Sequence, residues 1–380
     1  MGKIIRYLSK PVTRDLRKKM VFISGPRQVG KTTFALSFLK GTQAGHLAYL
    51  SWDNVHDRDK IKTAELPSKQ PVVIFDEVHK FARWRSLVKG LYDKYHNSTR
   101  FIVTGSARLD YFSKGGDSLF GRYYHYRLHP FSLAEISKNP TLDHAFHLLQ
   151  FGGFPEPYLS ASEITLKRWQ KERKQKIIYD DLRDLTLVKE TSLLDLLVDA
   201  LPARIGSPLS IKNLAEDLQV NHKTMERWLS ILERLYISFR IAPFGSPKIR
   251  AVKKEQKLYL WDWSACENEG ARFENMVACQ LLKYCHFQED VFGDSMELRY
   301  LRDTDKREVD FVVLKNKKAV FAVECRLSDT NLSPHIHYFS ARTDIPKFYQ
   351  VHLKEKDFGN ETTIGRSLPL THFVKELGLP

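Results

Sequence analysis

The sequence predicts an α/β protein with several domains, and three observations support this. Near the start, the β-branched run Val21–Ile23 enters a glycine-containing loop that is followed at once by a helical pattern. Further apolar runs of strand length recur as far as the aromatic run after Arg122, whereas residues 133–201 show the three- and four-residue spacing typical of helices. Strand-like runs that end in carboxylates return in the last third of the chain. Two sheets with a mainly helical region between them are therefore expected.

The first strand leads into a phosphate-binding pattern. From Gly25 to Thr32 the chain reads GPRQVGKT, the full G-x-x-x-x-G-K-[ST] pattern, with a strand before it and a helix after it. In such a loop the backbone amides surround phosphates at a helix N-terminus, the lysine reaches the β- and γ-phosphates, and the hydroxyl ligates Mg²⁺. Lys31 and Thr32 fit these two roles. The residues expected to bind the nucleotide are Gly25, Pro26, Arg27, Gln28, Val29, Gly30, Lys31, Thr32 and Thr33.

A second strand, PVVIFDE, ends in the carboxylates Asp76 and Glu77. The carboxyl ends of parallel strands meet at one edge of a sheet, so this pair is expected beside the phosphate-binding loop. Asp76 would hold Mg²⁺ together with Thr32, and Glu77 would act as the general base that polarises the attacking water. The two motifs together predict a hydrolytic site for ATP and Mg²⁺, in which Lys31 and Glu77 are catalytic.

The next two strand-like runs supply candidates for assisting residues. The run RFIVTGSARL ends in small polar residues, and either Thr104 or Ser106 is expected near the γ-phosphate; a simple turn at the end of the strand is the alternative. Arg122 and Arg108 are candidates for an arginine that stabilises charge on the transferred phosphoryl group, from the same subunit or from a neighbouring one. For each arginine, an ordinary surface position is the competing interpretation.

Five stretches, in this order and spacing, resemble a known family: GPRQVGKTT, IFDEVHKFARW, FIVTGSARLDYF, GRYYHYRLHPFSLAE and GGFPEPY. They are similar to those of prokaryotic AAA-type ATPases that carry a C-terminal domain of unknown function related to PD-(D/E)XK nucleases. The resemblance spans essentially the whole chain. It implies an AAA-type P-loop ATPase domain with a helical lid, with Ser106 as the sensor and Arg122 as the arginine finger. A finger that acts on a neighbouring subunit would require a homo-oligomer.

Residues 202–257 have the pattern of a winged helix-turn-helix. Ser210 and Asn221 are expected to cap two helices, and a strand follows the second helix. The apolar face of the second helix consists of Met225, Trp228, Leu229, Leu232 and Leu235. The candidates for DNA contact on its opposite edge are Lys223, Arg227 and Arg234. Because Glu226 and Glu233 flank this basic edge, a spacer between domains or a protein-binding module is the alternative.

Residues 258–380 have the arrangement of a restriction-endonuclease-like α/β domain. A helix and two strands carry Glu274, Asp310 and Glu324, and in such nucleases three carboxylates converge on Mg²⁺. Arg326 stands where those sites have lysine, and because arginine stays protonated it cannot serve as a base. Arg326 could orient a water, or its fork could span Asp310 and Glu324 in place of the metal. The PD-(D/E)XK-like site is therefore expected to be vestigial.

The net charge of +15 is uneven along the chain. Residues 1–150 hold 25 Lys and Arg against 12 Asp and Glu, residues 151–260 hold 19 against 14, and residues 261–380 hold 16 against 19. A basic surface attracts phosphate polyanions, so DNA is the expected partner of the first two-thirds; a merely soluble basic surface is the alternative. No apolar run reaches the length of about 20 residues that a membrane helix needs. A cytoplasmic protein without a membrane partner is expected.

The expected organisation is a P-loop ATPase core over residues 1–132, a helical lid over 133–201, a winged helix-turn-helix over 202–257 and a nuclease-like domain over 258–380. The expected function is ATP binding and hydrolysis by an AAA-type protein that acts on DNA as a DNA-dependent ATPase, motor or remodeller. Two alternatives stay open: an ATP-gated metal-dependent DNA nuclease, and a nucleotide-controlled switch that binds proteins without DNA.

Overall fold

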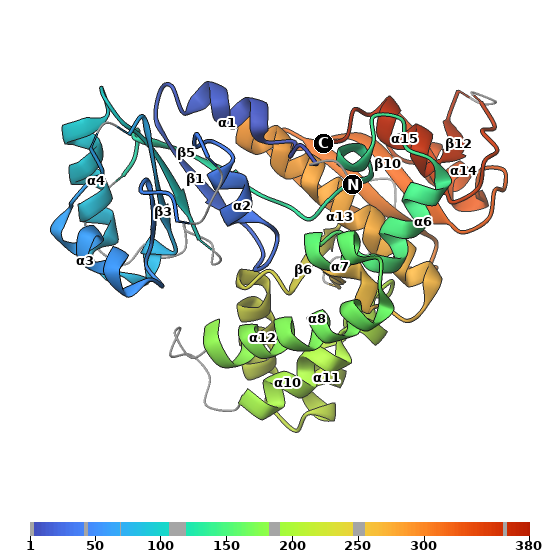
Figure 1. The fold of residues 1–380 in the computed structure, drawn as a ribbon. Helices are drawn as coiled ribbons and strands as arrows, with labels where there is room; N and C mark the ends of the chain where they lie inside the picture. The colour runs from blue at the N-terminus through green and yellow to red at the C-terminus, as the bar shows by residue number, and fades with distance from the viewer. Residues whose placement is uncertain are drawn as a thin grey trace. The chain divides into compact units, whose positions relative to one another are not determined.

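The structure, a computed structural model, contains two compact units, Gly2–His129 and Pro130–Pro380, which can be followed by colour in Figure 1. The described residues are 4–41, 45–68, 70–105, 119–181, 191–245, 255–359 and 363–380. Ser106 and Arg108 lie outside the described residues, so the sensor role of Ser106 stays a prediction.

The first unit is built on a parallel sheet. Its described strands pair in the order β2-β3-β4-β1-β5, and every neighbouring pair is parallel. Strand β1 is buried along its whole length, as is typical of a parallel sheet covered on both faces. The described elements are α1 (Ser9–Asp15), β1 (Met20–Ser24), α2 (Lys31–Leu36), β2 (Tyr49–Ser51), α3 (Val55–Thr63), β3 (Val72–Asp76), η1 (Val78–Lys80), α4 (Trp84–Tyr95), β4 (Arg100–Thr104) and β5 (Tyr123–Arg127). The parallel-sheet α/β fold predicted for the start of the chain is confirmed.

The second unit opens with helices, as the spacing of apolar residues predicts. Trp169 and Ile177 are buried, whereas Ile164 is 66% exposed. The described elements are α5 (Leu133–Ile136), α6 (Leu142–Phe151), α7 (Pro155–Ser160), α8 (Glu163–Gln175), the π-helical turn η3 (Lys176–Asp181), α10 (Thr191–Ala200) and η4 (Pro202–Arg204). Their function as a lid over a nucleotide stays a prediction.

A helix-turn-helix follows, formed by α11 (Ile211–Asp217) and α12 (His222–Arg234). The side chain of Ser210 accepts a hydrogen bond from the backbone N–H of residue 213, and Asn221 accepts one from the N–H of residue 224, so both predicted N-caps are present. The predicted apolar face of α12 is buried. The helix pair matches the predicted pattern, while its assignment as a winged helix stays a prediction.

A mixed sheet completes the second unit. Its described strands pair in the order β12-β11-β10-β9-β8-β6-β7. Strand β6 is antiparallel to β7 and parallel to β8, where Ala242 lies opposite Arg299, so the helix-turn-helix leads directly into the sheet of the C-terminal region. The described elements are β6 (Ser238–Pro243), β7 (Lys257–Leu260), η5 (Trp263–Ala265), α13 (Glu269–Phe292), β8 (Met296–Arg302), β9 (Glu308–Lys315), β10 (Lys318–Arg326), α14 (Pro334–Ser340), β11 (Phe348–His352), β12 (Gly365–Pro369) and α15 (Leu370–Glu376).

The long helix α13 packs against strands β7 to β10 of this sheet (Figure 1). Buried Asn275 fixes it to β7, because its side chain accepts from the N–H of Leu260 at 2.9 Å and donates to the Leu260 carbonyl at 2.7 Å. At the next turns, buried Lys283 donates to Ser132 Oγ at 2.9 Å and pairs with Glu135. Among the helices that the structure describes, none is both long and apolar enough to span a membrane.

Candidate active site

The phosphate-binding loop connects the end of β1 to the start of α2. Gly25 has a φ of +147°, and a Cβ atom built there would lie 2.3 Å from the carbonyl oxygen of Leu128. Gly30, the N-cap of α2, has a φ of +91° in the left-handed region. Both positions therefore require glycine, one for space and backbone angle and the other for backbone angle alone. The two glycines of the pattern therefore determine the backbone path of the predicted phosphate-binding loop.

Lys31 lies inside this loop. Its Nζ donates to the carbonyl oxygens of Gly25 at 3.0 Å and Pro26 at 2.7 Å, and the residue is only 7% exposed. The ammonium is thus held by the loop that would surround the phosphates. A phosphate oxygen offers this ammonium a stronger, charge-assisted partner than a carbonyl.

Asp76, at the end of β3, accepts hydrogen bonds from three hydroxyl groups. Thr32 Oγ1 donates to Asp76 Oδ2 at 2.8 Å, Tyr49 Oη donates to the same oxygen at 2.6 Å, and Thr104 Oγ1 donates to Asp76 Oδ1. The structure thus brings together Thr32 and Asp76, the two residues predicted to hold Mg²⁺. Burial raises the pKa of Tyr49, and the charge of Asp76 raises it further, so Tyr49 remains a neutral donor.

Of the two candidates for the sensor, Thr104 is fully buried and its hydroxyl donates to Asp76.

Tyr49 is a residue that reasoning from the sequence misses. It reaches Asp76 because β2 and β3 are parallel with Ser51 opposite Asp76, and residues two apart on a strand share a face. That register arises only in the folded sheet, so no local pattern marks Tyr49.

Glu77, the predicted general base, follows β3 in the left-handed region with a φ of +54°. Its Oε2 lies 3.7 Å from His79 Nε2 and 3.7 Å from Lys80 Nζ. Lys80 also donates to Asp53, at 2.8 Å. Burial lowers the pKa of His79, so Lys80 is the cation beside Glu77 at neutral pH. The predicted base is therefore part of an ion network that reaches the loop between β2 and α3.

Arg122, the predicted arginine finger, lies at the opposite edge of the sheet from the phosphate-binding loop of its own chain. It precedes β5, whose first residue Tyr123 lies opposite Met20 at the start of β1, whereas the loop follows the end of β1. Five strand residues separate the two edges by about 16 Å. The guanidinium donates to Asp93, with Nε 2.7 Å from Oδ1. This geometry disfavours action in the same subunit, and only action on a neighbouring subunit stays a prediction.

The predicted DNA-contacting residues lie on α12 in different settings. Lys223 and Arg227 are exposed, and Arg234 is partly buried. The two glutamates that flank this edge both pair with Arg240 of β6. Its Nε lies 2.7 Å from Glu233 Oε1, and its Nη1 lies 2.8 Å from Glu226 Oε1.

The three carboxylates of the predicted vestigial nuclease site lie close together in the second unit. Glu274 of α13 and Asp310 of β9 both face the ammonium of Lys257, at 3.1 and 3.7 Å, and Glu324 of β10 is buried beside them. The suggested bridge by Arg326 to two carboxylates is wrong. Arg326 Nη2 donates to Glu324 Oε1 at 2.6 Å, and its side chain is 43% exposed because it lies at the end of β10.

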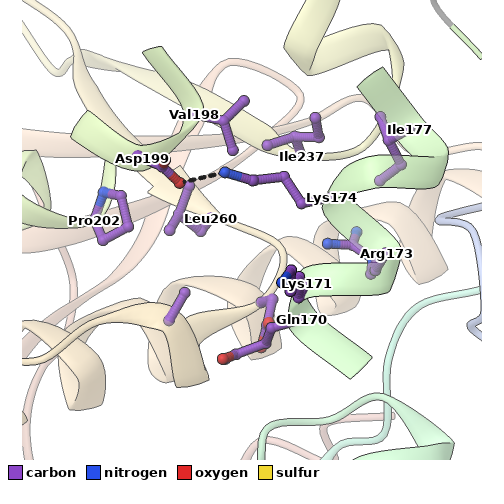
Figure 2. A pocket seen from close by; sticks show the side chains of 12 residues that line it. Gln170, Lys171, Arg173, Lys174, Ile177, Val198, Asp199, Pro202, Ile237 and Leu260 are labelled. Carbon is purple, nitrogen blue, oxygen red and sulfur yellow. Dashed lines mark hydrogen bonds and ion pairs between the residues drawn. The ribbon is translucent and has the colours of Figure 1, made fainter. Parts of the chain in front are cut away.

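A cavity of about 480 Å³ is lined by residues of α8 and α10, by Leu260 of β7 and by Ile237, which precedes β6 (Figure 2). Lys174 of α8 lines it and donates to Asp199 at 2.8 Å. Arg173 lines it too, but the residue is buried and its guanidinium lies over the rings of Phe154 and Trp169. These two cationic residues of α8 therefore serve ion pairing and packing within the unit.

The match to known families decides the class of the first unit. Residues 17–137 match the model of an AAA domain. Together with the parallel sheet and the loop geometry, this match supports an AAA-type P-loop domain. Residues 142–267 and 269–373 match two further models, each described as a domain of unknown function, so they add no support for a relation to nucleases.

Several curated proteins are similar to this chain, and each is described as uncharacterized. One from Methanocaldococcus jannaschii is 23% identical over 394 residues, covering 93% of this chain and 86% of that protein. One from Mycobacterium tuberculosis is 24% identical over 250 residues, covering 65% of this chain and 55% of that protein. Among solved structures, a substituted RuvB of Thermotoga maritima is 16% identical and covers 61% of this chain and 87% of that one, with a TM-score of 0.30, too low to bear on the fold.

Proposed function

We propose that this protein binds ATP with Mg²⁺ at the loop Gly25–Thr32 and hydrolyses it to ADP and phosphate. The observation that carries the proposal is the 2.8 Å hydrogen bond from Thr32 Oγ1 to Asp76 Oδ2. A loop hydroxyl and a strand-end carboxylate are the groups that hold Mg²⁺ in P-loop NTPases, and here they already lie in contact. When bound, the ion would neutralise charge on the β- and γ-phosphates.

Each remaining residue of the site has a role in the proposal. Lys31 would exchange its carbonyl partners for phosphate oxygens. Glu77 would take a proton from the attacking water as general base. Arg122 would act on the nucleotide of a neighbouring subunit, which requires a homo-oligomer, and Ser106 would contact the γ-phosphate, as the resemblance to AAA-type ATPases implies.

Two substitutions test the nucleotide site. Lys31→Ala is expected to abolish ATP binding, because the loop loses its only ammonium. Glu77→Gln is expected to leave binding intact and to block turnover, since the amide cannot accept the proton. Binding is measured with a fluorescent ATP analogue and turnover by phosphate release. Wild-type hydrolysis in either variant contradicts the site assignment.

We propose further that ATP hydrolysis is coupled to DNA, with α12 as a contact surface. The exposed side chains of Lys223 and Arg227, with both flanking glutamates bonded to Arg240, support a basic face suited to phosphates. Turnover should therefore rise when single-stranded, duplex or branched DNA is added. The rise for each DNA form would also reveal which structure the protein prefers.

Charge reversal on α12 separates this proposal from a nucleotide-controlled switch that binds only proteins. Lys223→Glu combined with Arg227→Glu should weaken a salt-sensitive gel shift, because two phosphate contacts are lost. Lys212→Glu is the matched control, since Lys212 is an exposed cation of the neighbouring helix α11 whose side chain is 79% exposed. Equal binding by wild type, double variant and control would remove α12 from the interface, and no DNA binding at all would favour the protein switch.

A further inference from the structure

Lys257, the first residue of β7, is buried among acidic side chains. The residue is 0% exposed, and its Nζ lies 3.1 Å from Glu274 Oε1 and 3.7 Å from Asp310 Oδ1 and is paired with Glu308 Oε1. We call Glu274, Glu308, Asp310 and Glu324 the carboxylate cluster. A fully buried lysine is rare unless it is paired, and here it contacts carboxylates from two different elements, α13 and β9.

Other groups of the chain also contact the carboxylate cluster. Arg302 Nη1 lies 2.6 Å from Glu308 Oε2, and Tyr259 Oη donates to Glu274 Oε1 at 2.7 Å. The backbone N–H of Cys325 donates to Asp310 Oδ2 at 2.8 Å. Most of the oxygens that would have to turn toward a metal ion are therefore already engaged by donors of the chain itself.

Cations of the chain offset most of the negative charge of the carboxylate cluster. Its four acidic groups face three cations, which are Lys257, Arg302 and Arg326. Glu324 Oε2 is buried and accepts no hydrogen bond from the residues that the structure describes.

We propose that the ammonium of Lys257 takes the position that a divalent cation would occupy in the carboxylate cluster. A Mg²⁺ or Ca²⁺ ion needs several oxygens at about 2.0–2.6 Å, and an ammonium between these carboxylates fills the space and repels a second cation. Within the described residues, no group of acidic, histidine or cysteine side chains is arranged to hold a metal ion. The metal that the resemblance to nucleases implies does not fit, and an internal cation joins β7, α13 and β9 instead.

Lys257 also cannot restore the lysine missing from the nuclease pattern. Burial alone would lower the pKa of Lys257, but the neighbouring carboxylates, Glu274 foremost, raise it above its usual value. Three carboxylates around one ammonium favour its charged form, whereas a general base must lose its proton near neutral pH. The side chain is a structural cation and has no free electron pair to offer a water molecule.

The proposal predicts that removing the ammonium creates a metal site. The experiment uses the full chain carrying Asp76→Asn, which removes the carboxylate predicted to bind metal at the ATP site. Terbium is added, and its binding is measured as terbium emission sensitised by nearby tyrosines such as Tyr259. Adding Lys257→Ala should raise this emission by roughly tenfold or more at equal terbium. Lys257→Arg, which keeps a cation, should not raise it. The gain should vanish when Asp310→Asn is added, because a ligand is lost.

Two results would overturn the proposal. One is terbium emission from the Asp76→Asn protein with Lys257 intact that depends on Asp310 and is as strong as the emission after Lys257→Ala is added. The native carboxylate cluster would then already bind metal. The other is a folded Lys257→Ala form without any gain. If Lys257→Ala does not fold alone, it is refolded from denaturant with and without Mn²⁺: folding that needs Mn²⁺ and Asp310 supports the proposal, and failure in both conditions refutes it. None of these readouts requires ATP hydrolysis.

Discussion

Replacing Tyr49 by phenylalanine removes a single oxygen from the surroundings of Asp76 and leaves the aromatic ring in the sheet. The lost hydrogen bond is 2.6 Å long and its acceptor is the carboxylate predicted to hold Mg²⁺. A hydrogen bond to a charged group contributes about 1.5–3 kcal/mol. Losing an outer partner of a metal ligand typically lowers metal affinity by about 10- to 100-fold. Because Thr32 and Thr104 still bond to Asp76, we expect the lower end, about tenfold.

The assay is a Mg²⁺ titration of ATP turnover at saturating ATP. For Tyr49→Phe the Mg²⁺ concentration at half-maximal rate should rise about tenfold, while the rate at saturating Mg²⁺ stays within about twofold of wild type. The matched control is Tyr126→Phe, which removes a similar tyrosine–aspartate bond in the same sheet, to Asp15. The control should lower the stability of the fold and leave the Mg²⁺ requirement unchanged.

Two outcomes would refute this reasoning. If Tyr49→Phe titrates with Mg²⁺ as wild type does, the hydroxyl does not position Asp76 for the ion. If Tyr49→Phe and Tyr126→Phe change the Mg²⁺ requirement equally, the effect comes from general loosening of the sheet. In either case the role of Asp76 itself would be tested separately, through Asp76→Asn.

Three further predictions concern other parts of the molecule. Gly25→Ala should lower nucleotide affinity at least about tenfold, because the new Cβ would lie 2.3 Å from the Leu128 carbonyl oxygen. Gly90→Ala is the control in the same binding assay and should leave the affinity unchanged, because nothing lies within 4 Å of a Cβ at that position. Arg122→Ala should abolish the rise of turnover per subunit with protein concentration; a wild-type profile that is flat would argue against a finger in trans. Arg240→Ala should weaken DNA binding in a gel shift, because both glutamates of α12 lose their partner and repel phosphates; unchanged affinity would place DNA elsewhere.

The nucleotide loop was predictable from sequence because its determinants are local. Glycine positions, the lysine and the hydroxyl follow one another along the chain, and the strand and helix around them have clear apolar patterns. The contact between Thr32 and Asp76 was also within reach, since the carboxyl ends of parallel strands share one edge. The sequence named Arg122 as a candidate finger, but it could not give the distance of Arg122 from the loop. That distance follows from the register of β5 on β1, in which Tyr123 lies opposite Met20.

The partner of the acidic residues in the second unit could not be predicted in the same way. Glu274, Asp310 and Glu324 were found through their order on a helix and two strands. Lys257 sits in a run that reads simply as a strand, and a lysine in such a run is normally a solvent-facing residue. Only the pairing of β6 with both β7 and β8 carries this side chain to the acidic residues.

The pairing of β6 with β8 has a practical consequence for dividing the protein. Although residues 202–257 and 258–380 read as separate domains, β6 supplies the parallel neighbour of β8. A fragment beginning at residue 258 would leave β8 as an open edge with unpaired N–H and C=O groups, and such edges invite other strands to add on. Laboratories that express the last third alone should thus obtain aggregates, whereas a fragment that starts at Pro130 keeps the sheet whole.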